Sequence, residues 1–213
     1  MKIIDVASLA IDAIKLVKFA RFSDQRGYFT EHYRRSDLRQ HPGTESLRAV
    51  EFVQCNESFS RKGTLRGLHF QWNPYMGKLV RTLSGRMLDI VLDIRKGSPT
   101  LGKAILHDMP ADPAASWQEW IWVPPGFAHG NVFPEDTTIE YMCSGEYSQG
   151  CEAGISPFAG DISWDLCHPG LKEVFDRITS NAPLVTDKDR HGFTLAAWIR
   201  DERSNQFTME ALT

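Results

Sequence analysis

The stretch RGLHFQWNPYMGKLV, residues 66–80, contains one histidine and one lysine in a segment that otherwise has the pattern of a β-strand. Side chains alternate along a strand, so His69 lies on one face and its neighbours Leu68 and Phe70 lie on the other. A polar face of this kind is typical either of a solvated surface or of a cavity wall. Lys78 favours the cavity, because lysine is rarely buried without a partner or a purpose.

A second histidine lies in VPPGFAHGNVF, residues 123–133, where prolines and glycines predict a stiff, sharply turned backbone. The pattern Pro-x-Gly-x-x-His that ends at His129 matches the second half of the motif of metal-binding cupin barrels. The first half of that motif supplies two histidines and a glutamate, whereas this chain has His69-Phe70-Gln71 and then Lys78. A catalytic metal usually has three protein ligands, and this chain offers only two histidines for one. A metal site built from His69, Gln71 and His129 is therefore only an alternative interpretation. A tight loop with an incidental histidine at position 129 is another.

Two further stretches contain groups that can exchange protons. In TIEYMCSGEYS, Tyr141 and Tyr147 are typical of barrel packing, but a tyrosine is also protonated at neutral pH and can act as a general acid. The stretch VTDKDRHG, residues 185–192, has the pattern of a charged surface turn when taken alone.

The composition argues against several classes of protein. The chain has 213 residues, 42% hydrophobic and 24% charged, with a formal net charge of −3 and no strong cluster of Lys and Arg, so nucleic acid is not the expected partner. The N-terminus lacks the apolar region of a signal peptide and no run of 18 apolar residues occurs, which predicts a cytoplasmic protein without a membrane partner. The four cysteines form no CxxC pair. We expect free thiols, with a disulfide between Cys143 and Cys151 as the alternative.

Elements that must position these residues follow from periodicity. Short strand-like runs separated by Gly and Pro turns recur between about residues 48 and 144 and predict a sandwich or jelly-roll barrel. The clearest, RMLDIVLDI at 86–94, follows Ser84-Gly85, which we interpret as a hairpin turn. Helices are expected at 36–41, with Ser36 as the N-cap, and at 170–178. No repeat or composition break interrupts the chain, so we expect one domain over residues 1–213.

Taken together, these stretches resemble the dTDP-4-dehydrorhamnose 3,5-epimerase family, nucleotide-sugar epimerases on a cupin barrel. The matching pieces occur in the family's order and cover roughly residues 20–190; they are DQRGYFTE (24–31), VQCNESFSRKGTLRGLHFQ (53–71), GKLVRTLSGRMLDIVLDIRKGSPTLG (77–102), WVPPGFAHG (122–130) and EYMCSGEYS (140–148). The resemblance implies an all-β, cupin-type double-stranded β-helix or jelly-roll barrel with a few short peripheral helices.

The resemblance also implies an acid–base reaction on a 4-keto-6-deoxy nucleotide sugar, without a metal or another cofactor. The ketone at C4 acidifies the C–H bonds at C3 and C5. His69 matches the family's base. An imidazole suits this role because it titrates near neutral pH, as an efficient base should. Lys78 matches the lysine that stabilises the enolate oxygen, and Tyr141 matches the general acid. Asp189 corresponds to the carboxylate that pairs with the base, with Asp187 as a rival.

The same resemblance assigns substrate contacts. Guanidinium groups suit a diphosphate, and the residues expected to bind phosphate, nucleotide or sugar are Arg26, Phe29, Glu31, Gln54, Asn56, Arg66, His129 and Lys188. A homodimer that completes the active site is expected as well. The aromatic residues of WNPYM, 72–76, differ from many members of the family, and we expect the substrate preference of this chain to depend on them. A metal-dependent cupin enzyme and a non-catalytic sugar-nucleotide binding module are the competing hypotheses.

Overall fold

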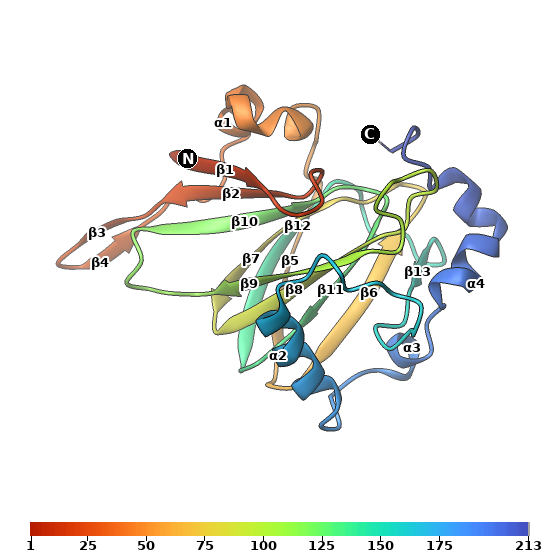
Figure 1. Ribbon diagram of the computed structural model, residues 1–213. Coiled ribbons are helices and arrows are strands. Elements are labelled where there is room, and N and C mark those ends of the chain that lie inside the picture. The colour runs from red at the N-terminus through yellow and green to blue at the C-terminus, as the bar shows by residue number, and fades with distance from the viewer. Residues whose placement is uncertain (213) are drawn as a thin grey trace.

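The computed structural model describes residues 1–212, and within this range two antiparallel sheets stack face to face (Figure 1). The six-stranded sheet contains, in spatial order, β1 (Ile3–Ser8), β2 (Lys15–Ala20), β10 (Trp117–Val123), β7 (Lys78–Ser84), β12 (Thr137–Cys143) and β5 (Gln54–Ser60). The five-stranded sheet contains β13 (Glu152–Gly154), β6 (Leu65–Gln71), β11 (Phe127–Val132), β8 (Arg86–Asp93) and β9 (Ala104–Pro110). A separate hairpin of β3 (Phe22–Asp24) and β4 (Gly27–Phe29) extends from one end of the sandwich. The expected all-β barrel is confirmed.

Strand alternation sorts the apolar side chains into layers. On β8, Met87 and Val91 point between the two sheets, where they pack with residues of the six-stranded sheet such as Ile121. Leu88 and Ile90, their neighbours on β8, point to the opposite face of the five-stranded sheet. Since β8 is apolar on both faces, it is a central strand buried from both sides.

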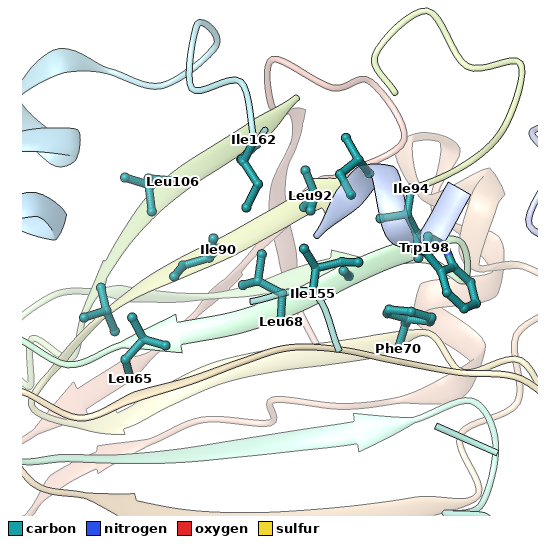
Figure 2. Close-up of a cluster of buried hydrophobic side chains, with 14 of the residues drawn as sticks. Leu65, Leu68, Phe70, Ile90, Leu92, Ile94, Leu106, Ile155, Ile162 and Trp198 are labelled. Carbon is teal, nitrogen blue, oxygen red and sulfur yellow. The ribbon is translucent and has the colours of Figure 1, made fainter. Parts of the chain in front are cut away.

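Helices cover the outer face of the five-stranded sheet. Figure 2 shows this layer, in which Phe70 of β6 lies beside Trp198 of α4 (Leu195–Arg200). The two rings are tilted, with centroids 4.5 Å apart. Phe175 of α2 (Pro169–Thr179) joins the same cluster farther along the sheet. The barrel is thus closed on this side by the C-terminal quarter of the chain.

The two expected helices are present, with one boundary corrected. The helix expected at 170–178 is confirmed as α2, which His168 caps. The first helix, α1 (Arg35–Gln40), begins one residue earlier than expected, so Ser36 lies inside it and Arg34 holds the N-cap position without a side-chain hydrogen bond. A 3₁₀ helix, η1 (Pro42–Leu47), follows α1, and both pack on the outer face of the six-stranded sheet through Leu38 and Leu47.

The turn at Ser84-Gly85 is real, but its interpretation as a hairpin is wrong. β7 pairs with β10 and β12, whereas β8 pairs with β11 and β9, so the chain crosses from one sheet to the other at Gly85. Gly85 has φ of 79°, and a Cβ there would lie 2.3 Å from the carbonyl oxygen of Asp136. Glycine is therefore required at the crossing. Both strands are apolar, and alternation alone does not say which strands pair.

The four cysteines are free, so the thiol expectation is confirmed and the Cys143–Cys151 disulfide is not formed. Among residues 1–212, no helix is both long and apolar enough to span a membrane.

Candidate active site

The space between the sheets is filled at one end by apolar side chains and opens at the other into a cavity of about 320 Å³. A volume of this order suits a small-molecule site. Val80 and Ile139 line the cavity and also belong to the interior cluster, so the cavity ends where the packed core begins. Most of the other lining side chains are polar; they are Ser58, Arg66, His69, Lys78, His129, Asn131, Tyr141, Thr186, Lys188 and Asp189.

The same alternation that builds the core points these polar groups inward. On β7, Leu79 packs on the outer face of its sheet, and Lys78 before it points into the cavity. On β12, Met142 packs outward and Tyr141 points inward. The polar row around His69 is therefore a cavity wall.

His69 is held by Asp189. Its Nε2 lies 2.7 Å from Oδ1 of Asp189, and the backbone N–H of Gly67 donates to Oδ2 at 3.3 Å. Asp189 lies in α3 (Asp187–Arg190), a single turn capped by the hydroxyl of Thr186, which accepts from the Asp189 N–H at 3.2 Å. Burial alone would raise the pKa of Asp189, but the contacts with His69, Gly67 and Thr186 outweigh it and lower that pKa.

The rival carboxylate lies elsewhere. Asp187 is exposed at the start of α3, and its backbone oxygen accepts from His191. Of the two aspartates, the structure pairs Asp189 with His69.

Lys78 and Tyr141 face His69 from the opposite sheet. Burial lowers the pKa of Lys78, with Cys143, Asp89 and Glu152 acting in the opposite direction. Burial raises the pKa of Tyr141, which keeps its phenol protonated at neutral pH. An imidazole and a phenol, groups that can accept and donate a proton, thus lie on opposite walls of one cavity, with a lysine on the same wall as the phenol.

A second histidine–carboxylate pair lies in the same cavity. Nε2 of His129 is 2.7 Å from Oδ2 of Asp89, which also accepts from Nδ2 of Asn131 at 3.0 Å. The sequence interpretation missed Asp89 and Asn131. A charged residue inside an apolar strand is the one signal that could have indicated Asp89, and Asp93 on the same strand shares it.

At the mouth of the cavity, Lys188 pairs with Glu152 at 2.6 Å. The hydroxyl of Tyr147 also donates to Glu152, at 3.0 Å. The contacts with Glu152 are the main cause of the raised pKa of Lys188, which therefore remains a cation. Glu152, on β13 beside the strand of His69, was also missed, because a single glutamate in a turn-rich segment has no distinguishing sequence pattern.

The remaining expected contacts divide into two groups. Arg66 lines the cavity, and Nε of this arginine donates to the hydroxyl of Ser60 at 2.9 Å. Asn56 lies opposite Tyr141 on the neighbouring strand and forms a hydrogen bond with it, and Gln54 donates to Asn56 at 3.1 Å. These residues border the site from β5 and β6.

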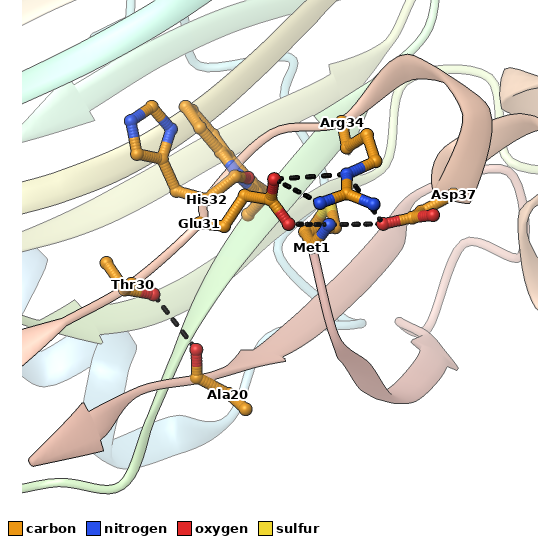
Figure 3. Close-up of polar contacts among 8 residues, drawn as sticks. Met1, Ala20, Thr30, Glu31, His32, Arg34 and Asp37 are labelled. Atoms are coloured by element: carbon orange, nitrogen blue, oxygen red, sulfur yellow. Dashed lines mark hydrogen bonds and ion pairs between the residues drawn. The ribbon is translucent and has the colours of Figure 1, made fainter.

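Arg26, Phe29 and Glu31 do not line the cavity. Arg26 pairs with Asp24 at the tip of the β3–β4 hairpin, and Phe29, also on the hairpin, is 68% exposed. Figure 3 shows Glu31 beside Arg34 and the N-terminal amine of Met1, both of which donate to its carboxylate.

The metal alternative requires Gln71, but its side chain is used elsewhere. The amide nitrogen donates to the carbonyl oxygens of Pro74 and Glu146, at 3.0 and 2.9 Å, and its oxygen accepts from the N–H of Ser148. Across residues 1–212, no three His, Cys, Asp or Glu side chains are grouped in a way that would hold a metal ion. The set His69, Gln71 and His129 is not assembled.

The aromatic residues of WNPYM also lie away from the cavity lining. Trp72 stacks on Trp198 with centroids 6.2 Å apart, and Tyr75 packs edge-on against Phe207 at 5.3 Å. The expectation that this segment determines substrate preference is not supported by its position, because its rings attach the C-terminal helices to the barrel.

A jelly-roll barrel with a histidine–carboxylate pair, a lysine and a tyrosine in its interior defines an acid–base enzyme of the cupin type. Comparison with known proteins identifies the family within this class. The family model of dTDP-4-dehydrorhamnose 3,5-epimerase matches residues 8–197. The chain belongs to this family of isomerases.

Individual proteins with similar sequences support the same family assignment. The dTDP-4-dehydrorhamnose 3,5-epimerases of Sinorhizobium fredii and Shigella flexneri are each 40% identical to this chain, over 74% and 71% of its length and 78% and 82% of theirs. The crystal structure of the dTDP-6-deoxy-D-glucose-3,5-epimerase of Legionella pneumophila, in complex with dTDP-4-keto-L-rhamnose, is similar with a TM-score of 0.76 and 28% identity, covering 94% of this chain and 96% of that one. The cupin-type fold is confirmed.

Proposed function

We propose that this chain inverts C3, C5 or both of a 4-keto-6-deoxy nucleotide sugar, most simply converting dTDP-4-dehydro-6-deoxyglucose to dTDP-4-dehydrorhamnose. The observation that carries the proposal is the pair of His69 and Asp189 on one cavity wall with Tyr141 and Lys78 on the other. Inversion at a carbon requires a base on one face of the sugar and an acid on the opposite face.

The step balances without an added reagent. His69 takes the proton from the carbon next to the ketone, and the C–H electron pair moves toward O4 to form an enolate. The ammonium of Lys78 stabilises that oxygen. When Tyr141 donates its proton to the other face, the ketone re-forms, and solvent returns the imidazolium and the tyrosinate to their starting states. Asp189 orients His69 and stabilises its imidazolium form.

Substrate binding follows from charge and position. Arg66 and Lys188 would bind the diphosphate, which competes with Glu152 for Lys188. Gln54, Asn56 and His129 would bind nucleotide and sugar oxygens. The proposed reaction needs no nucleic acid, and a cytoplasmic location suits an enzyme that acts on a charged sugar nucleotide.

We further propose that the chain acts as a single catalytic domain within a homodimer. The β3–β4 hairpin extends away from its own barrel, with Phe22 and Phe29 exposed. Exposed aromatic side chains on a projecting hairpin are typical of a contact surface. In the dimer, Arg26, Phe29 and Glu31 would reach the cavity of the partner subunit.

Incubation with dTDP-4-keto-6-deoxyglucose in deuterated water tests the reaction. We expect deuterium at C3, at C5 or at both, with an inverted product, and loss of both signals in His69→Ala and Lys78→Ala variants that keep the fold. Binding of the nucleotide sugar without exchange would instead identify a binding module. Absence of exchange with the dTDP-, GDP- and CDP-linked sugars would refute the proposal.

A further inference from the structure

Asp89 is a fully buried carboxylate in the interior of the barrel. Its neighbours on the inward face of β8, Met87 and Val91, belong to the apolar cluster between the sheets. A buried charge is costly unless it is paired and hydrogen-bonded. The presence of Asp89 here therefore requires a compensating group or a function.

Asp93 on the same strand provides a comparison, because it is also fully buried. Its two oxygens accept from Nε and Nη2 of Arg95 at 3.0 and 2.8 Å. The hydroxyls of Ser98 and Thr100 each donate to Oδ2 of Asp93 at 2.6 Å. One cation and two hydroxyls compensate this carboxylate, so its role is structural.

Asp89 lacks such compensation. Its Oδ2 accepts from His129 and Asn131, but its Oδ1 has no hydrogen-bond partner within residues 1–212, and no lysine or arginine of that range pairs with it. Both partners line the cavity. The negative charge therefore lies directly behind the cavity wall.

Lys78 is the complementary group on the other sheet. In the part of the chain that the structure describes, its Nζ makes no hydrogen bond or ion pair. Burial is the main influence on its pKa and lowers it, while Cys143, Asp89 and Glu152 raise it. Only the ammonium form can stabilise a developing anion, so the groups that favour this form decide whether Lys78 can act.

Of these three groups, Cys143 is uncharged at neutral pH, and Glu152 is shared with another lysine. Burial raises the pKa of the Cys143 thiol, which is therefore uncharged. Glu152 is already paired with the ammonium of Lys188 and accepts from Tyr147. Asp89 remains as the carboxylate that is not paired with another lysine.

We propose that Asp89 is a positioning residue, whose buried charge orients His129 and keeps Lys78 protonated from across the cavity. The catalytic meaning of this role rests on the proposed function, whereas the protonation of Lys78 does not. The two can therefore be tested separately.

The first experiment follows the charge of Lys78 directly. Protein labelled with ¹³C at the lysine ε-carbon is titrated by NMR, and the Lys78 signal is identified by its absence in Lys78→Arg. We expect Asp89→Asn to lower the titration midpoint by roughly one pH unit, the scale of a nearby opposite charge. The ionisable groups that face Lys78 from the other elements are the same in both proteins; they are Arg66, His69, His129, Tyr141, Cys143, Glu152, Lys188 and Asp189.

Asp93→Asn is the matched control, since it removes an equally buried charge from the same strand. It should lower stability but leave the Lys78 midpoint unchanged. Asp89→Ser serves as a second neutral variant if the asparagine does not fold. Equal midpoints in wild type and in the neutral Asp89 variants would overturn the proposal.

The second experiment measures kcat across pH. Activity should fall as pH rises through the Lys78 pKa, and in Asp89→Asn this alkaline limb should move to lower pH by about the NMR shift, roughly one unit. An inactive wild type would refute the proposed function and leave the NMR result to decide the role of Asp89. If Asp89→Asn shifts the NMR titration midpoint of Lys78 but leaves the alkaline limb of the kcat profile unchanged, the link between Asp89 and catalysis is refuted.

Discussion

His69 lies 120 positions from Asp189 in the sequence, yet their side chains meet at 2.7 Å. The pair gives the imidazole a fixed orientation and leaves its other nitrogen for the substrate. Asp189 is buried and receives three donors or partners, whereas Asp187 in the same short helix is exposed. The two aspartates form a natural matched pair for mutation.

Asp189→Asn should lower kcat by roughly 10²- to 10⁴-fold, the range attributed to a positioned acid or base, because the amide holds the wrong tautomer of His69. Asp187→Asn should remain within about twofold of wild type, as is usual for surface substitutions. Initial rates of sugar inversion, followed by NMR, provide the measurement. Similar losses in both variants would contradict the assignment of Asp189.

Tyr141→Phe should separate proton removal from inversion. His69 can still remove the proton and return solvent deuterium to the same face, but the opposite face loses its donor. We expect inversion to fall by about 10²-fold or more while deuterium exchange persists. Tyr75→Phe is the control, since that hydroxyl contacts Gln206 outside the cavity. Loss of exchange and inversion in equal measure would show that Tyr141 acts earlier in the reaction.

Family motifs predicted His69, Lys78, Tyr141 and Asp189 as site residues, and the structure brings these four side chains into one cavity. Their roles remain predictions. Asp89 was not predicted, since its contacts with His129 and Asn131 are visible only once the strands are in place. Asp89 and Asp93 look alike in RMLDIVLDI, and only their partners distinguish them.

Among the secondary-structure elements, the positions of the strands were predicted well from the sequence, but the pairing between strands was not. The runs at 86–94 and 117–123 correspond closely to β8 and β10, because alternation is a local property. The neighbours of a strand depend on contacts that are distant in sequence, so the crossing at Gly85 was interpreted as a hairpin. The packing of the aromatic residues of WNPYM was not predicted for the same reason, since their partners Trp198 and Phe207 lie beyond residue 190.

Trp198→Ala should lower the free energy of unfolding by about 3–5 kcal/mol, the usual range for truncating a buried aromatic residue. Trp198 is fully buried among Phe70, Trp72 and Phe207, and its loss leaves a cavity where α4 meets the barrel. Trp117→Ala, at the exposed start of β10, should cost much less. Urea unfolding at equilibrium checks both, and equal costs would contradict the packing role of α4.

In the whole molecule, the β3–β4 hairpin is a separate two-stranded unit that belongs to neither sheet of the barrel. Its aromatic side chains remain exposed, and among residues 1–212 its arginine is paired only with Asp24. The sequence placed Arg26 and Phe29 at the substrate through family resemblance. Their position in one chain is consistent with that role only if a second copy receives the hairpin.

Co-expression of Arg26→Ala and His69→Ala chains tests the shared site. Each variant alone should be strongly impaired. Random pairing makes about half of the dimers mixed, and each mixed dimer has one intact site, so activity should return to about a quarter of wild type. Activity no higher than that of the separate variants would show that Arg26 acts within its own chain or not at all.

Because α3 follows all the strands of the two sheets in the sequence, the site is completed later in folding than the sheets. Every strand of the two sheets lies before residue 155, whereas Asp189 arrives from the segment after α2. During synthesis, the sheets can therefore pair before the partner of His69 has left the ribosome. Closing so long a loop costs entropy that only the finished barrel repays. The barrel thus serves as the template on which the His69–Asp189 pair is assembled after the sheets, and recovery of activity during refolding should follow, and never precede, the burial of the tryptophans.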